Sequence, residues 1–307
     1  MSVSRPEEQR RVVRAYHAGS LNAVVGQDVG PAFTAATGLT VESRGGASVD
    51  LANAIRSGEI EADVFMSADA EVNDEVLMGP ASGDLVRWYA IMCRQRMVLA
   101  YSPASRFLAD FEAAVRGEIP WYEVLQSPGL VLKRSDPRHD PGGYRAVFAL
   151  TLAEARYGRP GLKDAVLKGD ENEAQITAGN YAAMMRGAVD AWLGYVTNVV
   201  AVGAPYLELP PEVDQSDPAL AAFYARASYT NPRGQTFRGT PLVYGVTIPT
   251  TAPNPDGAAR FVEYLLTQPG QAALARRGFL PSPILMAGDM MAVPSSLGWL
   301  IQGRYAR

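Results

Sequence analysis

Three short turns in the sequence carry groups that can bind an anion. Ser20 ends the turn 17–20, Ser48 ends the turn 45–48, and a helix is expected to start within the segment 140–145. A turn of this kind exposes backbone N–H groups at the positive end of a helix dipole, and a serine adds a hydroxyl donor. Each turn is therefore a candidate anion site. A serine at a helix start is more often only a cap, so that alternative stays open for both serines.

Acid–base and nucleophilic chemistry has little support in the sequence. His17 and His139 are the only histidines, and Cys93 is the only cysteine. A single cysteine forms neither an internal disulfide nor a cysteine metal cluster, and nothing around Cys93 suggests an activated thiol. The sequence has no Gly-x-Ser-x-Gly elbow, P-loop or Gly-x-Gly-x-x-Gly fingerprint. We therefore expect no enzymatic activity, no cofactor and no site for a transition-metal cation.

The composition is that of an ordinary folded protein. The chain has 307 residues, 48% of them hydrophobic and 20% charged, with a formal net charge of −4. This length suggests about two domains, and the acidic balance argues against a general nucleic-acid binder. Turn residues interrupt the longest uncharged stretch, 191–207, so no membrane-spanning helix is expected. Residues 1–14 lack the apolar centre of a signal peptide, which leaves a cytoplasmic protein or a leader outside this sequence.

The candidate turns lie between predicted strands and helices. Strands are expected at 12–16, 39–43 and 63–66, with helices at 21–38 and 49–57 between them. This alternation predicts an α/β architecture with a parallel sheet, in which ligands bind beyond the carboxyl ends of the strands. Further strands are expected at 88–91, 97–100, 130–133, 191–195 and 241–248, and further helices at 105–115, 121–125, 144–157 and 255–266. Residues 210–239 are expected to form a connector with little regular structure.

The turn segment before the helix expected at 144–157 reads Ser135-Asp136-Pro137-Arg138-His139-Asp140-Pro141-Gly142-Gly143-Tyr144-Arg145-Ala146, and further segments of interest occur in order at 16–21, 47–55, 62–69, 206–210 and 241–249. Together these segments, residues 135–146 most strongly, resemble the tungstate/molybdate-binding proteins of ABC importers, a family of periplasmic substrate-binding proteins. The resemblance covers residues 12–280. It implies a two-lobed α/β fold of the type II periplasmic-binding-protein kind, with the ligand in the cleft between the lobes. Residues 12–92 and 236–307 are expected to form lobe 1, and residues 93–235 lobe 2.

The resemblance also implies a set of ligand-binding residues. In lobe 1 it points to Ser20 and Ser48, each giving a hydroxyl and a backbone N–H group to the anion. In lobe 2 it points to Asp140, Gly142, Tyr195 and a backbone N–H near Ala178. Asp140 is the candidate direct ligand of the metal atom within the oxyanion. The sequence leaves open whether Asp140 binds that metal, is protonated, points toward Arg145 or Arg138, or is an ordinary turn residue.

One position departs from the family pattern. Tungstate-type members carry a glutamate immediately before the tyrosine that corresponds to Tyr195, and this chain has Gly194. In those members an aspartate and that glutamate together raise the metal from four ligands to six. With only Asp140 present, we expect an oxyanion that stays tetrahedral, or is at most five-coordinate.

The resemblance implies a transport function outside the cytoplasm. The expected protein is a monomer that captures tungstate or molybdate and delivers it to the permease subunits of an ABC importer. Two alternatives remain at this stage: a cytoplasmic oxyanion sensor or storage protein on the same fold, and a binder of another tetrahedral oxyanion such as sulfate.

Overall fold

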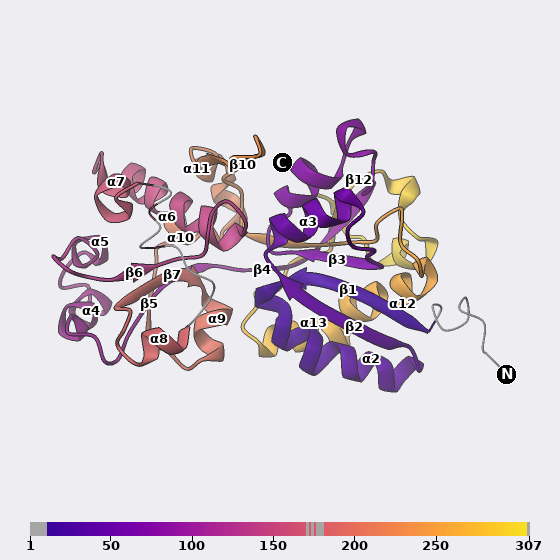
Figure 1. Ribbon diagram of the computed structural model, residues 1–307, viewed down its shortest axis with the longest axis horizontal. Helices are drawn as coiled ribbons and strands as arrows, with labels where there is room; N and C mark the ends of the chain where they lie inside the picture. Colours follow the sequence, from indigo (N-terminus) through magenta and orange to yellow (C-terminus); the bar gives the residue numbers. More distant parts are fainter. Residues whose placement is uncertain (1–10, 170–171, 173–174, 176–180, 306–307) are drawn as a thin grey trace. The chain divides into compact units, whose positions relative to one another are not determined.

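The computed structural model describes residues 11–169, 172, 175 and 181–305, and the chain divides into two compact units (Figure 1). Unit 1 consists of residues 1–94 and 243–307, and unit 2 consists of residues 95–242. The sequence placed the two crossings near residues 92 and 236, a few residues from these divisions. Each unit has its own sheet and its own helices.

Unit 1 contains a seven-stranded sheet in the order β13-β12-β4-β11-β3-β1-β2. Its strands are β1 (Val12–Ala18), β2 (Thr40–Gly46), β3 (Val64–Ser67), β4 (Trp88–Arg94), β11 (Val243–Thr247), β12 (Leu285–Gly288) and β13 (Gly303–Arg304). β1 lies parallel between β2 and β3, whereas β11 runs antiparallel to β3 and to β4. The expected parallel pairing is therefore confirmed for β1, β2 and β3, but the sheet as a whole is mixed. Parallel pairing needs a crossover connection, and β11 enters from unit 2 without one.

Helical segments lie on both sides of the first three strands, with α3 on one side and α2 and α13 on the other (Figure 1). The longer segments are η2 (Val24–Val29), α2 (Gly30–Thr37), α3 (Ser48–Ser57), α12 (Pro255–Leu266) and α13 (Gln268–Arg276). The shorter ones are η1 (Gly19–Leu21), η3 (Asn73–Leu77), η4 (Pro80–Ser82), η6 (Met290–Ala292) and η7 (Ser295–Leu300). α2 and α3 end at Gly38 and Gly58, whose positive φ of 73° and 76° suits glycine. The helix expected over 21–38 is divided, since a π-helical segment precedes α2.

Unit 2 contains a four-stranded sheet in the order β6-β7-β5-β8. Its strands are β5 (Met97–Tyr101), β6 (Leu132–Lys133), β7 (Ala191–Tyr195) and β8 (Tyr206–Glu208). The main helix, α6 (Pro141–Tyr157), starts with proline, which is favoured in the first helical turn. The other helices of the unit before residue 210 are α4 (Leu108–Val115), α5 (Trp121–Val124), α7 (Leu162–Leu167), α8 (Tyr181–Met185) and α9 (Val196–Ala201). Figure 1 shows α6 on one side of the sheet and α8 and α9 on the other.

Residues 210–239 are more regular than the sequence predicted. They form α10 (Pro211–Asp214), η5 (Pro218–Leu220), α11 (Ala221–Tyr224) and a hairpin of β9 (Ser228–Thr230) and β10 (Thr236–Arg238). The expectation of an irregular connector is wrong. A small number of apolar side chains in this segment is enough to order it, because they pack against α6. The ring of Tyr144 on α6 stacks on that of Phe237, with centroids 4.6 Å apart, and lies 6.4 Å from that of Tyr229.

Among the described residues, none of the helices combines the length and apolar character needed to cross a bilayer.

Candidate functional site

Ser20 and Ser48 follow two neighbouring parallel strands of unit 1. Ser20 lies in η1, directly after β1, and Ser48 is the first residue of α3, two positions after the end of β2. The last residues of these strands, Ala18 and Gly46, are register partners. Both serines therefore lie at the carboxyl edge of the sheet, where ligands bind in open α/β folds.

Neither serine is a helix cap. Ala18 and Ala47 occupy the N-cap positions of η1 and α3, and neither makes a side-chain capping hydrogen bond. The hydroxyl of the fully buried Ser48 accepts the N–H of Ala68, which follows β3, at 3.2 Å. Ser20 Oγ lies 2.8 Å from the phenol oxygen of Tyr244.

These contacts leave protons available for an anion. A serine hydroxyl has one donor proton and two acceptor lone pairs, so Ser48 keeps its proton while it accepts from Ala68. When the Tyr244 phenol donates to Ser20, the Ser20 proton is likewise available. Tyr244 belongs to a segment that carried the family resemblance. It lies within a buried strand, where a tyrosine is typical of the hydrophobic core. Sequence reasoning therefore did not single it out.

Four residues of unit 2 gather around the start of α6. Asp140 is the N-cap of this helix, and its carboxylate accepts the N–H of Gly142 at 2.7 Å. A Cβ atom built at Gly142 would lie 2.8 Å from Asp140 Oδ1, 3.4 Å from Ser135 Oγ and 3.6 Å from Tyr195 Cε2. The structure therefore brings together the three described lobe 2 positions that the resemblance suggested. It adds the Ser135 hydroxyl, which was quoted in the matching segment but not assigned a role.

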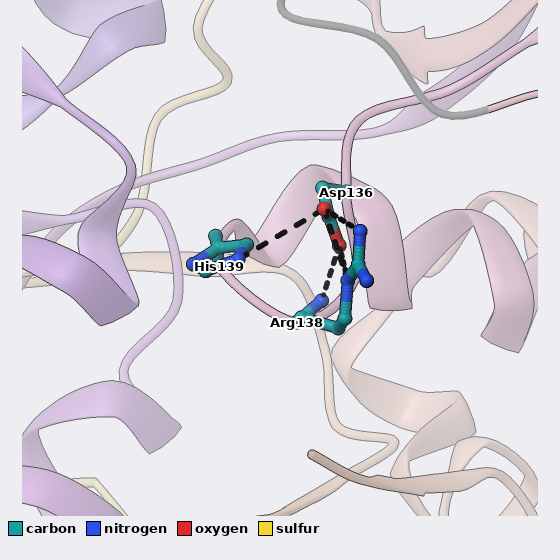
Figure 2. A network of polar contacts seen from close by, with 3 residues as sticks. All are labelled: Asp136, Arg138 and His139. Carbon is teal, nitrogen blue, oxygen red and sulfur yellow. Dashed lines mark hydrogen bonds and ion pairs between the residues drawn. The ribbon is translucent and has the colours of Figure 1, made fainter. Parts of the chain in front are cut away.

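The loop before α6 is held by a local ion pair. The guanidinium and backbone N–H of Arg138 donate to the Asp136 carboxylate at 2.7–3.1 Å, and His139 Nε2 lies 4.0 Å from Asp136 Oδ2 (Figure 2). Partial burial would raise the pKa of Asp136, but the hydrogen bonds from Arg138 outweigh burial and lower it. Asp136 is thus a carboxylate that binds Arg138 next to the candidate site.

Gly143 allows this loop to approach the helix closely. A Cβ atom there would lie only 2.4 Å from the Asp136 carbonyl carbon and from Pro137 N. Gly142 and Gly143 therefore have different roles: the first faces the candidate site, and the second permits close packing of the loop.

The space beside Gly194 is filled by neutral side chains. A Cβ atom at this position would lie 2.9 Å from the Trp192 indole nitrogen and 3.1 Å from the Tyr181 hydroxyl. Burial raises the pKa of Tyr181, and its hydroxyl hydrogen-bonds with the Asn198 and Trp192 side chains. A carboxylate side chain at 194 would require these groups to move.

Two further residues complete the comparison with the sequence. Ala178 lies outside the described residues. His17 is fully buried beside the Ser20 turn, with Nε2 2.7 Å from Ser43 Oγ and Nδ1 2.9 Å from the Ala18 carbonyl oxygen. Burial lowers the pKa of His17, although the hydrogen bond to Ala18 opposes this.

Comparisons with known proteins agree with this architecture. The family described as bacterial extracellular solute-binding protein matches residues 13–280. A putative ABC transporter molybdenum-binding protein of Haloferax volcanii is 34% identical over 242 residues, covering 78% of this chain and 73% of that protein. A molybdate/tungstate-binding protein of Thermococcus kodakarensis is 26% identical, covering 97% of this chain and 89% of that protein.

Two solved structures are similar in fold. The periplasmic molybdate-binding protein of Azotobacter vinelandii has a TM-score of 0.61 at 16% identity, over 88% of this chain and 99% of that one. The sulfate-binding protein of Mycobacterium tuberculosis has a TM-score of 0.60 at 16% identity, over 96% of this chain and 93% of that one. The expected periplasmic-binding-protein fold is therefore confirmed.

Proposed function

Because this chain belongs to the family of bacterial extracellular solute-binding proteins, we propose that it captures molybdate or tungstate and delivers the oxyanion to the permease of an ABC importer. The observation that carries the proposal is the pair of serines, Ser20 and Ser48, at the carboxyl ends of adjacent parallel strands. The Ser48 hydroxyl accepts the Ala68 N–H and keeps its proton, and the Ser20 hydroxyl shares one hydrogen bond with Tyr244. The names of the Haloferax and Thermococcus relatives support the choice of anion.

Each unit carries donors that suit a tetrahedral oxyanion. Burying such an ion is costly unless its oxygen atoms are hydrogen-bonded. In unit 1 the donors are the Ser20 and Ser48 hydroxyls. In unit 2 the Gly142 N–H, the Tyr195 hydroxyl and the Ser135 hydroxyl lie at the start of α6. Hydroxyl and amide donors do not titrate near neutral pH, so binding would not require a change in their protonation.

Asp140 decides how the anion engages unit 2. Its carboxylate accepts the Gly142 N–H that an oxyanion would also use. Either the carboxylate rotates to bind the metal atom directly, or it repels the dianion and must turn away. Among the described residues we assign Asp140 as the ligand of the metal, because Gly194 offers no side-chain donor.

The same family assignment supports the remaining parts of the function. We propose a binding protein without chemical turnover, located on the outer side of the cytoplasmic membrane and acting as a monomer. The permease subunits of the importer are its proposed partners.

Calorimetric titration of the purified protein with molybdate, tungstate and sulfate tests the proposal. We expect tight one-to-one binding of molybdate and tungstate and weaker binding of sulfate. Tight binding also raises the melting temperature by mass action. A protein that binds none of the three anions, or that prefers sulfate, would refute the proposed cargo.

A further inference from the structure

The two places where the chain enters and leaves unit 2 are hydrogen-bonded to each other. Gln95 begins the unit and Leu242 ends it. The Gln95 N–H donates to the Leu242 carbonyl at 3.0 Å, and the Leu242 N–H donates to the Gln215 carbonyl at 2.7 Å. The two crossing segments are therefore in direct backbone contact.

The first crossing is bound to the start of α9, immediately after Tyr195. The Gln95 side-chain amide donates to Thr197 Oγ1 at 2.9 Å, and its carbonyl oxygen accepts the Arg96 N–H at 2.9 Å. The Arg96 carbonyl in turn accepts the N–H of Val196 at 3.2 Å. Gln95 is fully buried and Thr197 is 5% exposed, so water does not compete freely for these bonds.

The second crossing is bound to α6, the helix whose start carries Asp140 and Gly142. Arg145 donates to the Thr240 carbonyl at 2.5 Å and to Thr240 Oγ1 at 2.9 Å. It also donates to Gln215 Oε1 at 3.1 Å, and Gln215 Nε2 returns a bond to the Arg145 carbonyl at 3.0 Å. Both side chains are fully buried.

The backbone conformation of Gln215 is independent evidence that neighbouring contacts hold this residue in place. Its φ is +64°, in the left-handed region that residues other than glycine rarely adopt. Such strain persists only when neighbouring contacts determine the conformation. Here those contacts are the bonds to Arg145 and Leu242.

We propose that Gln95, Arg145, Gln215, Thr197 and Thr240 form a positioning network that couples the anion-binding elements of unit 2 to both chain crossings. The network fixes the start of α6 relative to Tyr195. When an anion orders these two elements, the network passes that ordering to residues 95 and 242, the two ends of unit 2. This inference rests on the proposed function, since it concerns the same anion.

Three threonine-to-valine variants test the network with matched chemistry. Thr240→Val removes an acceptor of Arg145, and Thr197→Val removes the acceptor of the Gln95 amide. Thr151→Val is the control, because its hydroxyl donates to the Val147 carbonyl within α6 and has no bond to either crossing. Thr240→Ser and Thr197→Ser keep the hydroxyl and serve as rescue variants.

Two measurements separate positioning from general stability: calorimetric titration with molybdate, and amide hydrogen exchange at Gln95, Val196 and Leu242. We expect Thr240→Val and Thr197→Val each to weaken molybdate binding about three- to tenfold, with wild-type affinity in the control and in both serine variants. Molybdate should slow exchange at the three amides in the wild type, and slow it less in the two network variants. If one of the two network variants, Thr240→Val or Thr197→Val, folds poorly, the other still tests the network.

The results distinguish this inference from the proposed function. Wild-type binding with equal affinity and exchange in all three valine variants would overturn the network while leaving the function intact. A lower melting temperature in the network variants, with affinity and exchange response unchanged, would show a merely structural role and overturn it too. Absence of molybdate binding by the wild type would overturn both.

Discussion

Unit 1 offers an anion two hydroxyls at the ends of parallel strands, whereas unit 2 offers the start of a helix whose amide already binds a carboxylate. In unit 1 the Ser48 hydroxyl accepts a backbone N–H and keeps its proton for a ligand. In unit 2 the Gly142 N–H is occupied by Asp140 at 2.7 Å. A dianion can therefore bind the unit 1 donors without displacing an internal negative charge, but in unit 2 it must displace Asp140 or be bound by it. We infer that unit 1 supplies affinity and that unit 2 supplies discrimination between anions.

The largest expected effect comes from removing the unit 1 hydroxyls. Ser20→Ala and Ser48→Ala each delete a donor to a charged acceptor, worth about 1.5–3 kcal/mol. Molybdate affinity should fall by about one to two orders of magnitude for each variant, measured by calorimetric titration. Binding should weaken without disappearing, because the backbone N–H groups remain.

Two companion variants sharpen this result. Ser57→Ala removes an exposed hydroxyl at the other end of α3, which donates to the Ala54 carbonyl, and should bind as the wild type does. Tyr244→Phe removes the phenol hydroxyl beside Ser20 but keeps the serine. Its loss of molybdate affinity should therefore be smaller than that of Ser20→Ala. Unchanged titration curves for both Ser20→Ala and Ser48→Ala would contradict the inference that the unit 1 hydroxyls supply the affinity for the anion.

One buried titratable group in each unit, His17 in unit 1 and Asp214 in unit 2, should respond to pH in opposite directions. His17 in unit 1 has a lowered pKa, mainly through burial, so its contribution to stability is lost as the pH falls through the folded-state value. Burial raises the pKa of Asp214 in unit 2 to about 6, from 3.8. For Asp214 the protonated form is favoured in the fold, so its contribution is present below pH 3.8 and is lost as the pH rises through about 6.

Asp214→Asn tests this second difference. At pH 8 the variant should be more stable than the wild type by about 2–3 kcal/mol, since it removes a buried charge and each pKa unit corresponds to about 1.4 kcal/mol. The gain should vanish near pH 4. Chemical denaturation at both pH values measures it, with Asp217→Asn as the control because Asp217 caps the neighbouring η5 in a more exposed position. An equal gain at both pH values would show that burial of the Asp214 charge is not its cause.

A pair of adjacent glycines separates binding from folding within unit 2. The Cβ atom of Gly142→Ala would lie 2.8 Å from Asp140 Oδ1 and would force that carboxylate to shift at the candidate site. We expect molybdate affinity to fall about tenfold, or by about 1.4 kcal/mol, with little change in melting temperature.

Gly143→Ala is the counterpart of this variant. Its Cβ atom would meet the Asp136–Pro137 backbone at 2.4–2.6 Å, which should lower stability by about 1–3 kcal/mol. Thermal unfolding and titration of both variants provide the comparison. If Gly142→Ala loses stability and keeps full affinity, the start of α6 is not part of the site.

The sequence predicted most local elements but not their long-range contacts. The apolar run of β1, the terminal glycine of α3 and the amphipathic pattern of α12 are local features, and the structure confirms those elements. The antiparallel position of β11 depends on how the chain returns from unit 2, which no local pattern specifies. For the same reason the hairpin at 228–238 was missed, because its order comes from rings stacked on Tyr144.

The candidate site shows the same division. Ser20, Ser48 and Asp140 occur in turns with a local signature, so they could be proposed from the sequence and the family resemblance. Tyr244 reaches Ser20 across 224 positions of the chain, and Trp192 and Tyr181 fill the space beside Gly194 through tertiary packing. Contacts of this kind require the three-dimensional structure.

The smallest expected effect is the difference between the two metals, and it depends on the unit 2 half of the site. The space next to Gly194 is filled by Trp192 and Tyr181, which are neutral, so Asp140 is the one carboxylate that we assign to the metal. We predict a bound oxyanion that stays tetrahedral, or is at most five-coordinate through Asp140. Selection then rests on anion size and hydrogen-bond geometry. Tungstate and molybdate are nearly equal in size and should bind within about tenfold of each other, a difference of about 1.4 kcal/mol. Sulfate is smaller and should leave donors unpaired, at a cost of about 1–3 kcal/mol for each group. X-ray absorption at the metal edge measures the coordination directly: a shell of six ligands with two long metal–oxygen distances would contradict the prediction and would require a second protein ligand besides Asp140.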